Sequence, residues 1–228
     1  MDLNLYSILF LFMTIGVYIG GTFLYKWKKH PFTIPIITAT GTIILVLIFF
    51  GIPYDSYMVG AQWVDRLLGP AVVALAYPLY LYRNVIKQSM FPLLFSIFGG
   101  VVVGIGSGFL FARMIGMKEN VVFSVLPKSV TTPVAMEITR VTGGTPSLAV
   151  AFVMIAGIGG VMLAPYVFKW FKIDHEMAKG IGLGSASHAI GTSKALEYGH
   201  QAAAISSVAM TLSAILASLL IPIMSIWL

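Results

Sequence analysis

Long runs without a charged residue dominate the sequence. They cover residues 34–50, 90–112, 145–168 and 201–228, and a further apolar run covers residues 5–25. A bilayer core about 30 Å thick is crossed by roughly 20 apolar residues in a helix. A helix of a soluble protein needs a polar face, which these runs lack. The pattern therefore predicts an all-α, polytopic membrane protein.

Composition narrows the class of protein further. Hydrophobic residues make up 58% of the 228 residues and charged residues 10%, whereas a soluble domain carries about 25% charged residues. The chain has no cysteine, which excludes disulfides and thiolate metal sites. No linker or low-complexity stretch divides it. We therefore expect a single transmembrane domain over residues 1–228, with six to eight transmembrane helices.

Basic residues gather in short loops and predict the orientation. Residues 26–29 hold three lysines, and residues 83–87 hold Arg83 and Lys87 two predicted spans later. Cytoplasmic loops carry the excess of Lys and Arg, so both loops should be cytoplasmic and the N-terminus outside. The net charge of +6 then reflects membrane orientation, and we expect no nucleic-acid partner. The start has no basic leader or cleavage motif, which favours a retained first helix in a bacterial inner membrane over a signal peptide.

The segment over residues 120–143 departs from this pattern. Pro127 and Pro133 each remove a backbone donor and predict helix breaks. Irregular backbone at membrane depth is tolerated where protein or a wet cavity surrounds it, so such breaks point to binding sites in transporters. The groups between the two prolines suit a small carboxylate, with a cation and three hydroxyls: Lys128, Ser129, Thr131 and Thr132.

Other interpretations of this segment stay open. Lys128 can extend to the membrane interface, and the hydroxyls can bond to their own helix. Glu137 is a candidate coupling residue, or else a structural partner of Lys128 or Arg140. The segment is long enough to cross the membrane fully, although the distribution of Lys and Arg mildly favours a re-entrant path.

The segment over residues 177–199 is the second irregular one. Gly182, Gly184 and Gly191 predict either an unwound helix or very close packing. His188 lies among them and is a candidate for substrate binding and proton coupling, because imidazole titrates near neutral pH. The alternative is a buried neutral histidine with both nitrogens bonded. The predicted substrate-binding hydroxyls nearby are Ser185, Ser187 and Thr192.

Two further observations complete the residue-level picture. The predicted third span, residues 62–82, contains Pro70 and is a third candidate for an interrupted helix. Enzyme chemistry is not expected, because Gly182 and Gly184 lack the strand context of a dinucleotide fingerprint and no carboxylate cluster suits a metal. We therefore expect no cofactor, no metal and no catalytic residues.

Three stretches of the chain resemble the LrgB/CidB family. They read LLGPAVVALAYPLY, LPKSVTTPVAMEI and KGIGLGSASHAIGTSKALEYG, and the likeness extends over essentially the whole chain. The residues that match the family pattern are Pro127, Thr131, Thr132, Gly184, His188 and Gly191. Lys128 and Glu137 stand at positions that vary in the family, which shifts weight toward the hydroxyls and helix ends.

The resemblance carries expectations about fold and function. Family members are bacterial inner-membrane proteins, commonly paired with a small LrgA/CidA-type membrane protein, and a plant relative transports glycolate and glycerate. The likeness implies crossed, broken helices similar to those of antiporters or symporters. It also implies transport of small monocarboxylates such as pyruvate, glycolate or glycerate, coupled to protons or cations. The alternative is an antiholin-like regulator of murein hydrolase activity and cell lysis; a homo-oligomer is compatible with either function.

Overall fold

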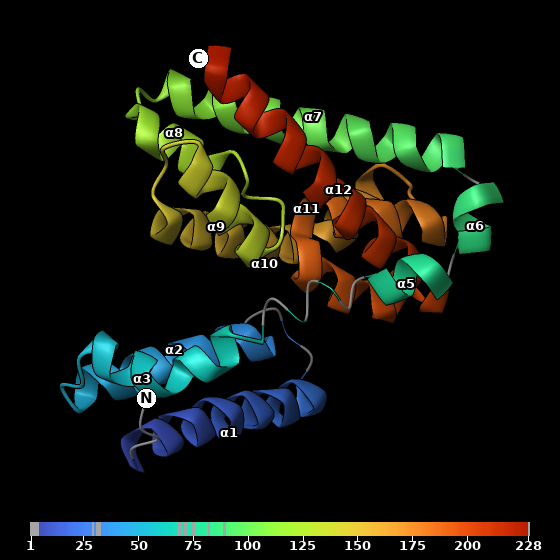
Figure 1. Cartoon of the computed structure of the whole chain (residues 1–228). Coiled ribbons are helices and arrows are strands. Elements are labelled where there is room, and N and C mark those ends of the chain that lie inside the picture. The colour runs from blue at the N-terminus through green and yellow to red at the C-terminus, as the bar shows by residue number, and fades with distance from the viewer. Residues whose placement is uncertain are drawn as a thin grey trace. The chain divides into compact units, whose positions relative to one another are not determined.

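A computed structural model of the protein describes residues 5–28, 30, 33–67, 70, 73, 76–81, 83–88 and 90–227. All regular secondary structure in these residues is helical (Figure 1). Among them, four helices are long and apolar enough to cross a membrane: α1 (Leu5–Trp27), α7 (Met90–Met114), α10 (Pro146–Trp170) and α12 (His200–Trp227). These helices match four of the spans predicted from the apolar runs, those over residues 5–25, 90–112, 145–168 and 201–228.

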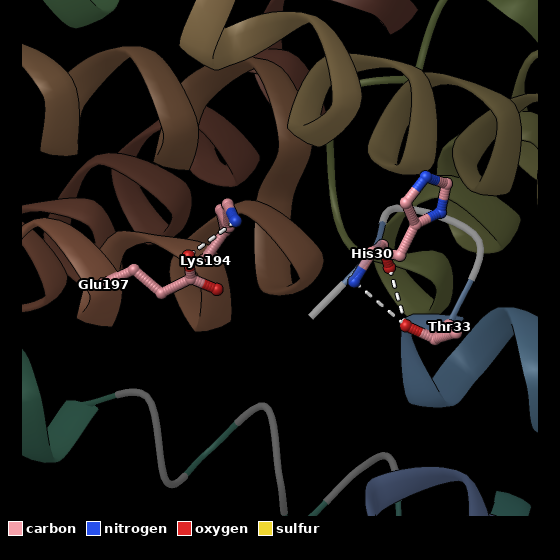
Figure 2. Close-up of polar contacts among 4 residues, drawn as sticks. All are labelled: His30, Thr33, Lys194 and Glu197. Carbon is pink, nitrogen blue, oxygen red and sulfur yellow. Dashed lines mark hydrogen bonds and ion pairs between the residues drawn. The ribbon is translucent and has the colours of Figure 1, made fainter. Parts of the chain in front are cut away.

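The chain divides into two compact units, of which the first is Met1–Val73. In it, α1 packs against both α2 (Pro35–Phe49) and α3 (Tyr54–Asp65). The Phe10 and Tyr57 rings meet edge to face at 5.9 Å. Between α1 and α2, the Thr33 hydroxyl donates to the His30 carbonyl over 2.8 Å (Figure 2).

Two of the predicted spans differ from the helices of the structure. The span expected over residues 32–51 is the 15-residue helix α2, which begins at Pro35 and is followed by Gly51 with a φ of 61°. In place of one helix over residues 62–82, α3 ends at Asp65, and α5 (Ala76–Leu81) begins later. Pro70 falls between them, and its neighbours 68, 69, 71 and 72 lie outside the described residues, so the predicted break there stays a prediction.

The second unit, Ala74–Leu228, contains the remaining helices. Besides α5 and the long helices α7, α10 and α12, these are α6 (Arg83–Gln88), α8 (Glu119–Val125), α9 (Thr132–Val141), α11 (Glu176–Ala195) and the 3-10 turn η2 (Leu196–Tyr198). Its apolar core joins α7, α9, α10 and α12 and includes Ile97, Ile138, Val153, Ile205 and Ile221. We predicted a single domain over residues 1–228. The two units are defined by their internal contacts and do not test that prediction.

Large apolar side chains stay exposed along the long helices of the second unit. Phe95 and Phe111 on α7, Ile155 on α10 and Leu219 on α12 are each between 59% and 76% exposed. In water such surfaces would favour aggregation, whereas lipid solvates them. The exposed surface of these helices is therefore suited to lipid, and the polar groups of interest are the few that are buried in the core.

Candidate functional site

The first irregular segment is interrupted where the two prolines stand. Helix α8 ends at Val125, residues 126–131 are not helical, and α9 begins at Thr132 with Thr131 as its N-cap residue. Pro133 lies in the first turn of α9, where a missing N–H leaves no bond unmade. Pro127 is fully buried within the interruption.

The chain returns close to its starting point after this interruption. The Ser124 hydroxyl, near the end of α8, accepts a 2.8 Å hydrogen bond from the Thr145 amide at the start of α10. A Cβ on Gly144 would lie 3.0 Å from the Ser124 nitrogen. Residues 125–144 therefore leave and re-enter the same neighbourhood, and residues 126–131 form the tip of this excursion. We call the segment from Glu119 to Val141 the α8–α9 hairpin.

Lys128, at the tip of the α8–α9 hairpin, is held against α7. Its ammonium donates a 2.5 Å hydrogen bond to the Gly104 carbonyl. A Cβ on Gly108 would lie 2.6 Å from the Lys128 nitrogen, so a larger residue there would displace the flexible end of the lysine. Glu137 does not join it: its carboxylate pairs with Arg140 at 2.6 Å, and both side chains are more than 60% exposed.

Helix α11 bends sharply at the predicted histidine. Ser187 (φ −126°, ψ 15°) and His188 (φ 42°, ψ −132°) leave helical geometry. In a straight helix, residues 183 and 191 would lie about 12 Å apart, yet a Cβ on Gly191 would overlap the Leu183 carbonyl. The two arms of α11 therefore fold back on each other, and we call Glu176–Ala195 the α11 hairpin.

The packing of α11 on α12 gives the same geometry independently. A Cβ on Gly180 would overlap the Ala202 carbonyl, and a Cβ on Gly184 would overlap the Ser206 carbonyl. The residue numbers of both partners increase by four from one contact to the next, so the first arm of α11 runs parallel to α12. Two helical segments that follow each other in the chain can run parallel only if the chain between them turns back. The Lys179 nitrogen accordingly lies 5.4 Å from the Tyr198 ring, at the base of the hairpin.

The three glycines predicted to break this helix act in another way. The departure from helical geometry falls at Ser187 and His188, whereas Gly184 and Gly191 allow close backbone approach. Gly182 meets only a Phe168 ring atom, at the ordinary contact distance of 3.7 Å. At the base of the hairpin, Lys194 pairs with Glu197 at 2.6 Å (Figure 2).

Polar groups at the α11 tip have partners inside the protein. The His188 Nε2 lies 3.0 Å from the Val153 carbonyl of α10, and the histidine is 3% exposed. The Thr192 hydroxyl donates to the His188 carbonyl over 3.0 Å and lies 3.0 Å from the Ser206 hydroxyl of α12, from which it can accept. Ser187 is also buried, facing α10 at Gly160.

A narrow pocket lies between the tip of the α8–α9 hairpin and Ser185 on the first arm of the α11 hairpin. Its volume is about 10 Å³, and α7 and α12 complete its lining. Its polar lining consists of Ser129, Ser185 and Ser213. Its interior is narrow, with room for a water molecule rather than for a larger ligand. We call it the tip pocket.

Two hydroxyls in this region have no hydrogen-bond partner. Ser213 in the tip pocket is 1% exposed, and Thr131 at the N-cap of α9 is 8% exposed; neither Oγ atom is bonded. A buried hydroxyl without a partner costs about 1–3 kcal/mol. Groups of this kind have spare hydrogen-bonding capacity for a ligand or water. The Ser185 hydroxyl instead donates to the Ile181 carbonyl.

Two of the candidate substrate-binding residues, Ser129 and Ser185, line this pocket. The other six do not: Lys128, Thr131, Thr132, Ser187, His188 and Thr192. Ser213 was missed, because a lone serine in the apolar run of α12 gives no local signal. The glycines of α7 did give a signal in the sequence, because Gly100, Gly104 and Gly108 recur every four residues. In the structure they face Ser185, Ser129 and Lys128, respectively.

Comparison with known proteins agrees with this architecture. The model of the LrgB-like family matches residues 14–227. The chain belongs to the LrgB-like family. A Bacillus subtilis LrgB relative, "uncharacterized protein YxaC", is 47% identical over 97% of this chain and 96% of its own length. The Staphylococcus aureus (strain Mu50) "holin-like protein CidB" is 35% identical over 96% of this chain and 95% of its own length. No solved structure matches the chain.

Family membership and the long apolar helices agree on the class of protein. The chain is a multi-pass membrane protein of the LrgB-like family with bacterial relatives. The predicted resemblance to this family is thus confirmed. It covers both irregular segments, since residues 14–227 include each of them.

Proposed function

We propose that this protein is a secondary transporter, or the transport subunit of a pair, for small monocarboxylates such as pyruvate, glycolate or glycerate. The observation that supports this most is a pocket lined by the α8–α9 tip, the first arm of α11, α7 and α12, in which the buried Ser213 hydroxyl has no partner. Transporters build substrate sites from interrupted helices, because free backbone groups and polar side chains can then face a substrate inside the membrane. The substrate passes through chemically unchanged, without a cofactor or metal.

In this proposal both hairpins are re-entrant and enter from opposite faces of the membrane. Six crossings follow: α1, α2, the predicted span over residues 62–82, α7, α10 and α12. With the N-terminus outside, Arg83, Lys169, Lys172 and Lys179 all lie in the cytoplasm, as the positive-inside rule requires. The α8–α9 hairpin enters from outside and the α11 hairpin from the cytoplasm of a bacterial cell.

A carboxylate is the ligand class that the tip pocket suits. Ionised carboxylates only accept hydrogen bonds, and the pocket offers hydroxyl donors on Ser129 and Ser213, while the unpartnered Thr131 follows the lining residue Val130 in the chain. Lys128 supplies the positive charge, because an ammonium has three donors and one is used on Gly104. The narrow interior corresponds to a closed state, so the hairpins have to separate to admit substrate.

His188 is the coupling residue in this proposal. It occupies a strained backbone position at the α11 tip and links α11 to α10 through Val153. A carbonyl only accepts, so Nε2 carries the proton of the neutral ring, and protonation adds a second donor at Nδ1 and a charge that strengthens the bond to Val153. A proton taken up there would therefore be tied to movement of the hairpin.

Uptake by the purified protein tests the transport proposal. The protein is reconstituted into proteoliposomes, with and without an LrgA/CidA-type partner. Uptake of labelled pyruvate or glycolate is then measured under an imposed pH gradient. Saturable uptake that depends on the gradient is expected. The absence of saturable uptake in both preparations would overturn the proposal, whatever the behaviour of single variants.

A second candidate function comes from the printed names of the relatives. Several are called holin-like protein CidB, which favours an antiholin-like regulator of cell lysis that acts with an LrgA/CidA-type partner, or as a homo-oligomer. Under this function, membrane leakage would change with the partner and survive substitution of Thr131, Thr132 and His188. If those variants lose leakage and uptake together, lysis follows from metabolite flux.

A further inference from the structure

A second and wider pocket lies on the other side of the α11 hairpin. Its volume is about 290 Å³, and it is more open than the tip pocket. Its walls are Tyr77 and Leu81 of α5, Thr192 and Ser193 on the second arm of α11, and His200 and Ser207 in the first turns of α12. We call it the base pocket, because it lies beside the base of the α11 hairpin.

We propose that the base pocket is a second binding site for the same class of small carboxylates, at the cytoplasmic entrance of the transport path. The inference rests on the proposed transport function. The lining offers hydroxyl and imidazole donors, and the described lining residues include no carboxylate. Helix α12 begins at this pocket, so the free N–H groups of its first turn add positive potential.

The hydroxyls of the base pocket can be released to a ligand. Ser193 donates to the Ala189 carbonyl and Ser207 to the Ala203 carbonyl, each over 3.1 Å and each four residues earlier. Such bonds to the helix's own backbone are weak competitors. A hydroxyl rotates freely about one bond, so a charged oxygen in the pocket would draw the donor away from the carbonyl.

Charge gives the side of the membrane on which the base pocket opens. Arg83 in α6 follows α5, which forms one wall of the pocket, and Lys87 lies one turn further on. Both belong to the loop that the positive-inside rule assigns to the cytoplasm. Exposed cations beside an opening raise the local concentration of anions. The base pocket therefore faces the cytoplasm.

The second arm of the α11 hairpin contacts α12 at Thr192, near the residues of α12 that line the two pockets. Ser207 lines the base pocket and Ser213 the tip pocket, a separation of about 9 Å along α12. Thr192, which itself lines the base pocket, lies 3.0 Å from the Ser206 hydroxyl and 3.9 Å from the Met210 sulfur, and both partners are buried. The second arm of the α11 hairpin therefore closes the path at Thr192.

Cysteine labelling tests the base pocket directly, because the natural chain has no cysteine. S207C probes the base pocket and S213C the tip pocket. S218C is the matched control on the same helix, since Ser218 is exposed, lines neither pocket and donates only to Ala214. Each variant, once shown to be monodisperse, is treated with an anionic, membrane-impermeant methanethiosulfonate in right-side-out and inside-out vesicles.

The expected pattern is one-sided. S207C should react from the cytoplasmic face, at least about tenfold faster than S218C, while S213C should stay unreactive from that face. Reaction of S207C from the outer face only would overturn the assignment of the side. Equal reaction of S207C and S213C from the cytoplasm, or no reaction of S207C from either face, would overturn the separate site.

Removing the Thr192 hydroxyl should open the path between the pockets. Thr192→Val keeps the shape of the side chain and removes its bonds to Ser206 and to the His188 carbonyl. S213C should then react from the cytoplasm about fivefold faster, the ratio expected for the loss of the one hydrogen bond that joins the hairpin to α12. Thr211→Val is the control, because Thr211 donates only within α12. An equal change in both variants would contradict closure at Thr192.

Protection of S207C from labelling by pyruvate distinguishes failure of this inference from failure of the transport proposal. If the base pocket binds carboxylates, millimolar pyruvate should slow the labelling of S207C several-fold and leave S218C unchanged. Protection without uptake in proteoliposomes would keep the site and overturn transport. Uptake without protection or labelling of S207C would keep transport and overturn the base pocket as a binding site.

Discussion

The two hairpins handle their buried polar groups in opposite ways. At the α11 tip, His188 bonds to Val153, and Thr192 bonds to the His188 carbonyl and to Ser206. At the α8–α9 tip, Thr131 is buried without a partner and Ser129 lines the tip pocket. Polar groups that bond to one another across elements stiffen their surroundings, whereas unbonded groups are available to a ligand.

This difference suggests a division of labour between the hairpins. In the proposed transporter, the α11 hairpin is the stiff element that moves as a body and closes the path at Thr192. The α8–α9 hairpin supplies the groups that a carboxylate would bind, with Lys128 held nearby on the glycines of α7. Substitutions that affect stiffness in one hairpin and binding in the other can break this comparison or sharpen it.

The largest effect is expected at the contact between the α11 hairpin and α12. A methyl group on Gly184 would overlap the Ser206 backbone, which has no room to shift. We expect Gly184→Ala to lower the free energy of unfolding by about 1–3 kcal/mol and to abolish uptake, as measured by thermal unfolding in detergent and by transport assay.

Gly182→Ala is the matched control, two residues away on the same arm. A methyl group there would meet only a Phe168 ring atom at 3.7 Å. Alanine is the better helix former by about 0.5–1 kcal/mol, so this variant should be as stable as the natural protein or more so. Equal losses in the two variants would mean that α11 does not pack on α12 as a parallel arm.

The next effect concerns the tip of the α11 hairpin. His188 has a φ of 42°, a conformation that costs a residue with a Cβ about 1–3 kcal/mol and glycine much less. We therefore expect His188→Gly to unfold at a higher temperature than His188→Ala, although both lose the bond to Val153. Uptake measured from pH 5.5 to 8 should lose its pH dependence in both variants.

The two measurements on His188 report on different roles. If His188→Gly keeps normal uptake with an unchanged pH profile, the imidazole is a structural group and the coupling proposal fails. If His188→Ala is the more stable of the two, the sharp bend at the tip is not present in the folded protein.

A smaller effect, on uptake alone, is expected in the α8–α9 hairpin. Thr131→Val removes an unpartnered buried hydroxyl without leaving a cavity, so stability should stay equal or rise slightly. A hydrogen bond to a charged ligand contributes about 1.5–3 kcal/mol, so the KM for pyruvate should rise at least about tenfold.

Thr139→Val serves as the control for this variant. Thr139 is also buried and unpartnered in α9, but it lies at the end of the hairpin remote from the tip. Its substitution should leave the KM unchanged. A similar rise in KM for both variants would show that the effect comes from packing in α9 and not from binding at the tip.

The long spans and the positions of both irregular segments could be predicted from the sequence. Uncharged runs of this length have few other solutions in a membrane, and Pro127, Pro133 and the glycines stand out against them. Ser129 and Ser185 were predicted for the same reason, because each lies close to a break. Local composition is enough to predict a feature that depends only on the residues of its own segment.

The return of α11 on itself could not be predicted in this way. It depends on which glycines face α12: Gly180 and Gly184 do, and Gly182 does not. The sharp bend falls at Ser187 and His188, where no glycine marks it. Ser213 was missed because its partners come from α7 and both hairpins, which meet only in the folded chain.

The smallest effect is expected for the exposed ion pair on α9. Glu137 and Arg140 are 66% and 62% exposed and lie one helical turn apart, and such pairs contribute at most about 0.5 kcal/mol. Glu137→Gln should therefore change the unfolding temperature little and leave the KM and the pH profile of uptake as they are. The sequence alone left a coupling role for Glu137 open. A lost pH dependence in this variant, with His188 intact, would move proton coupling from the stiff hairpin to the binding one and reverse the division of labour.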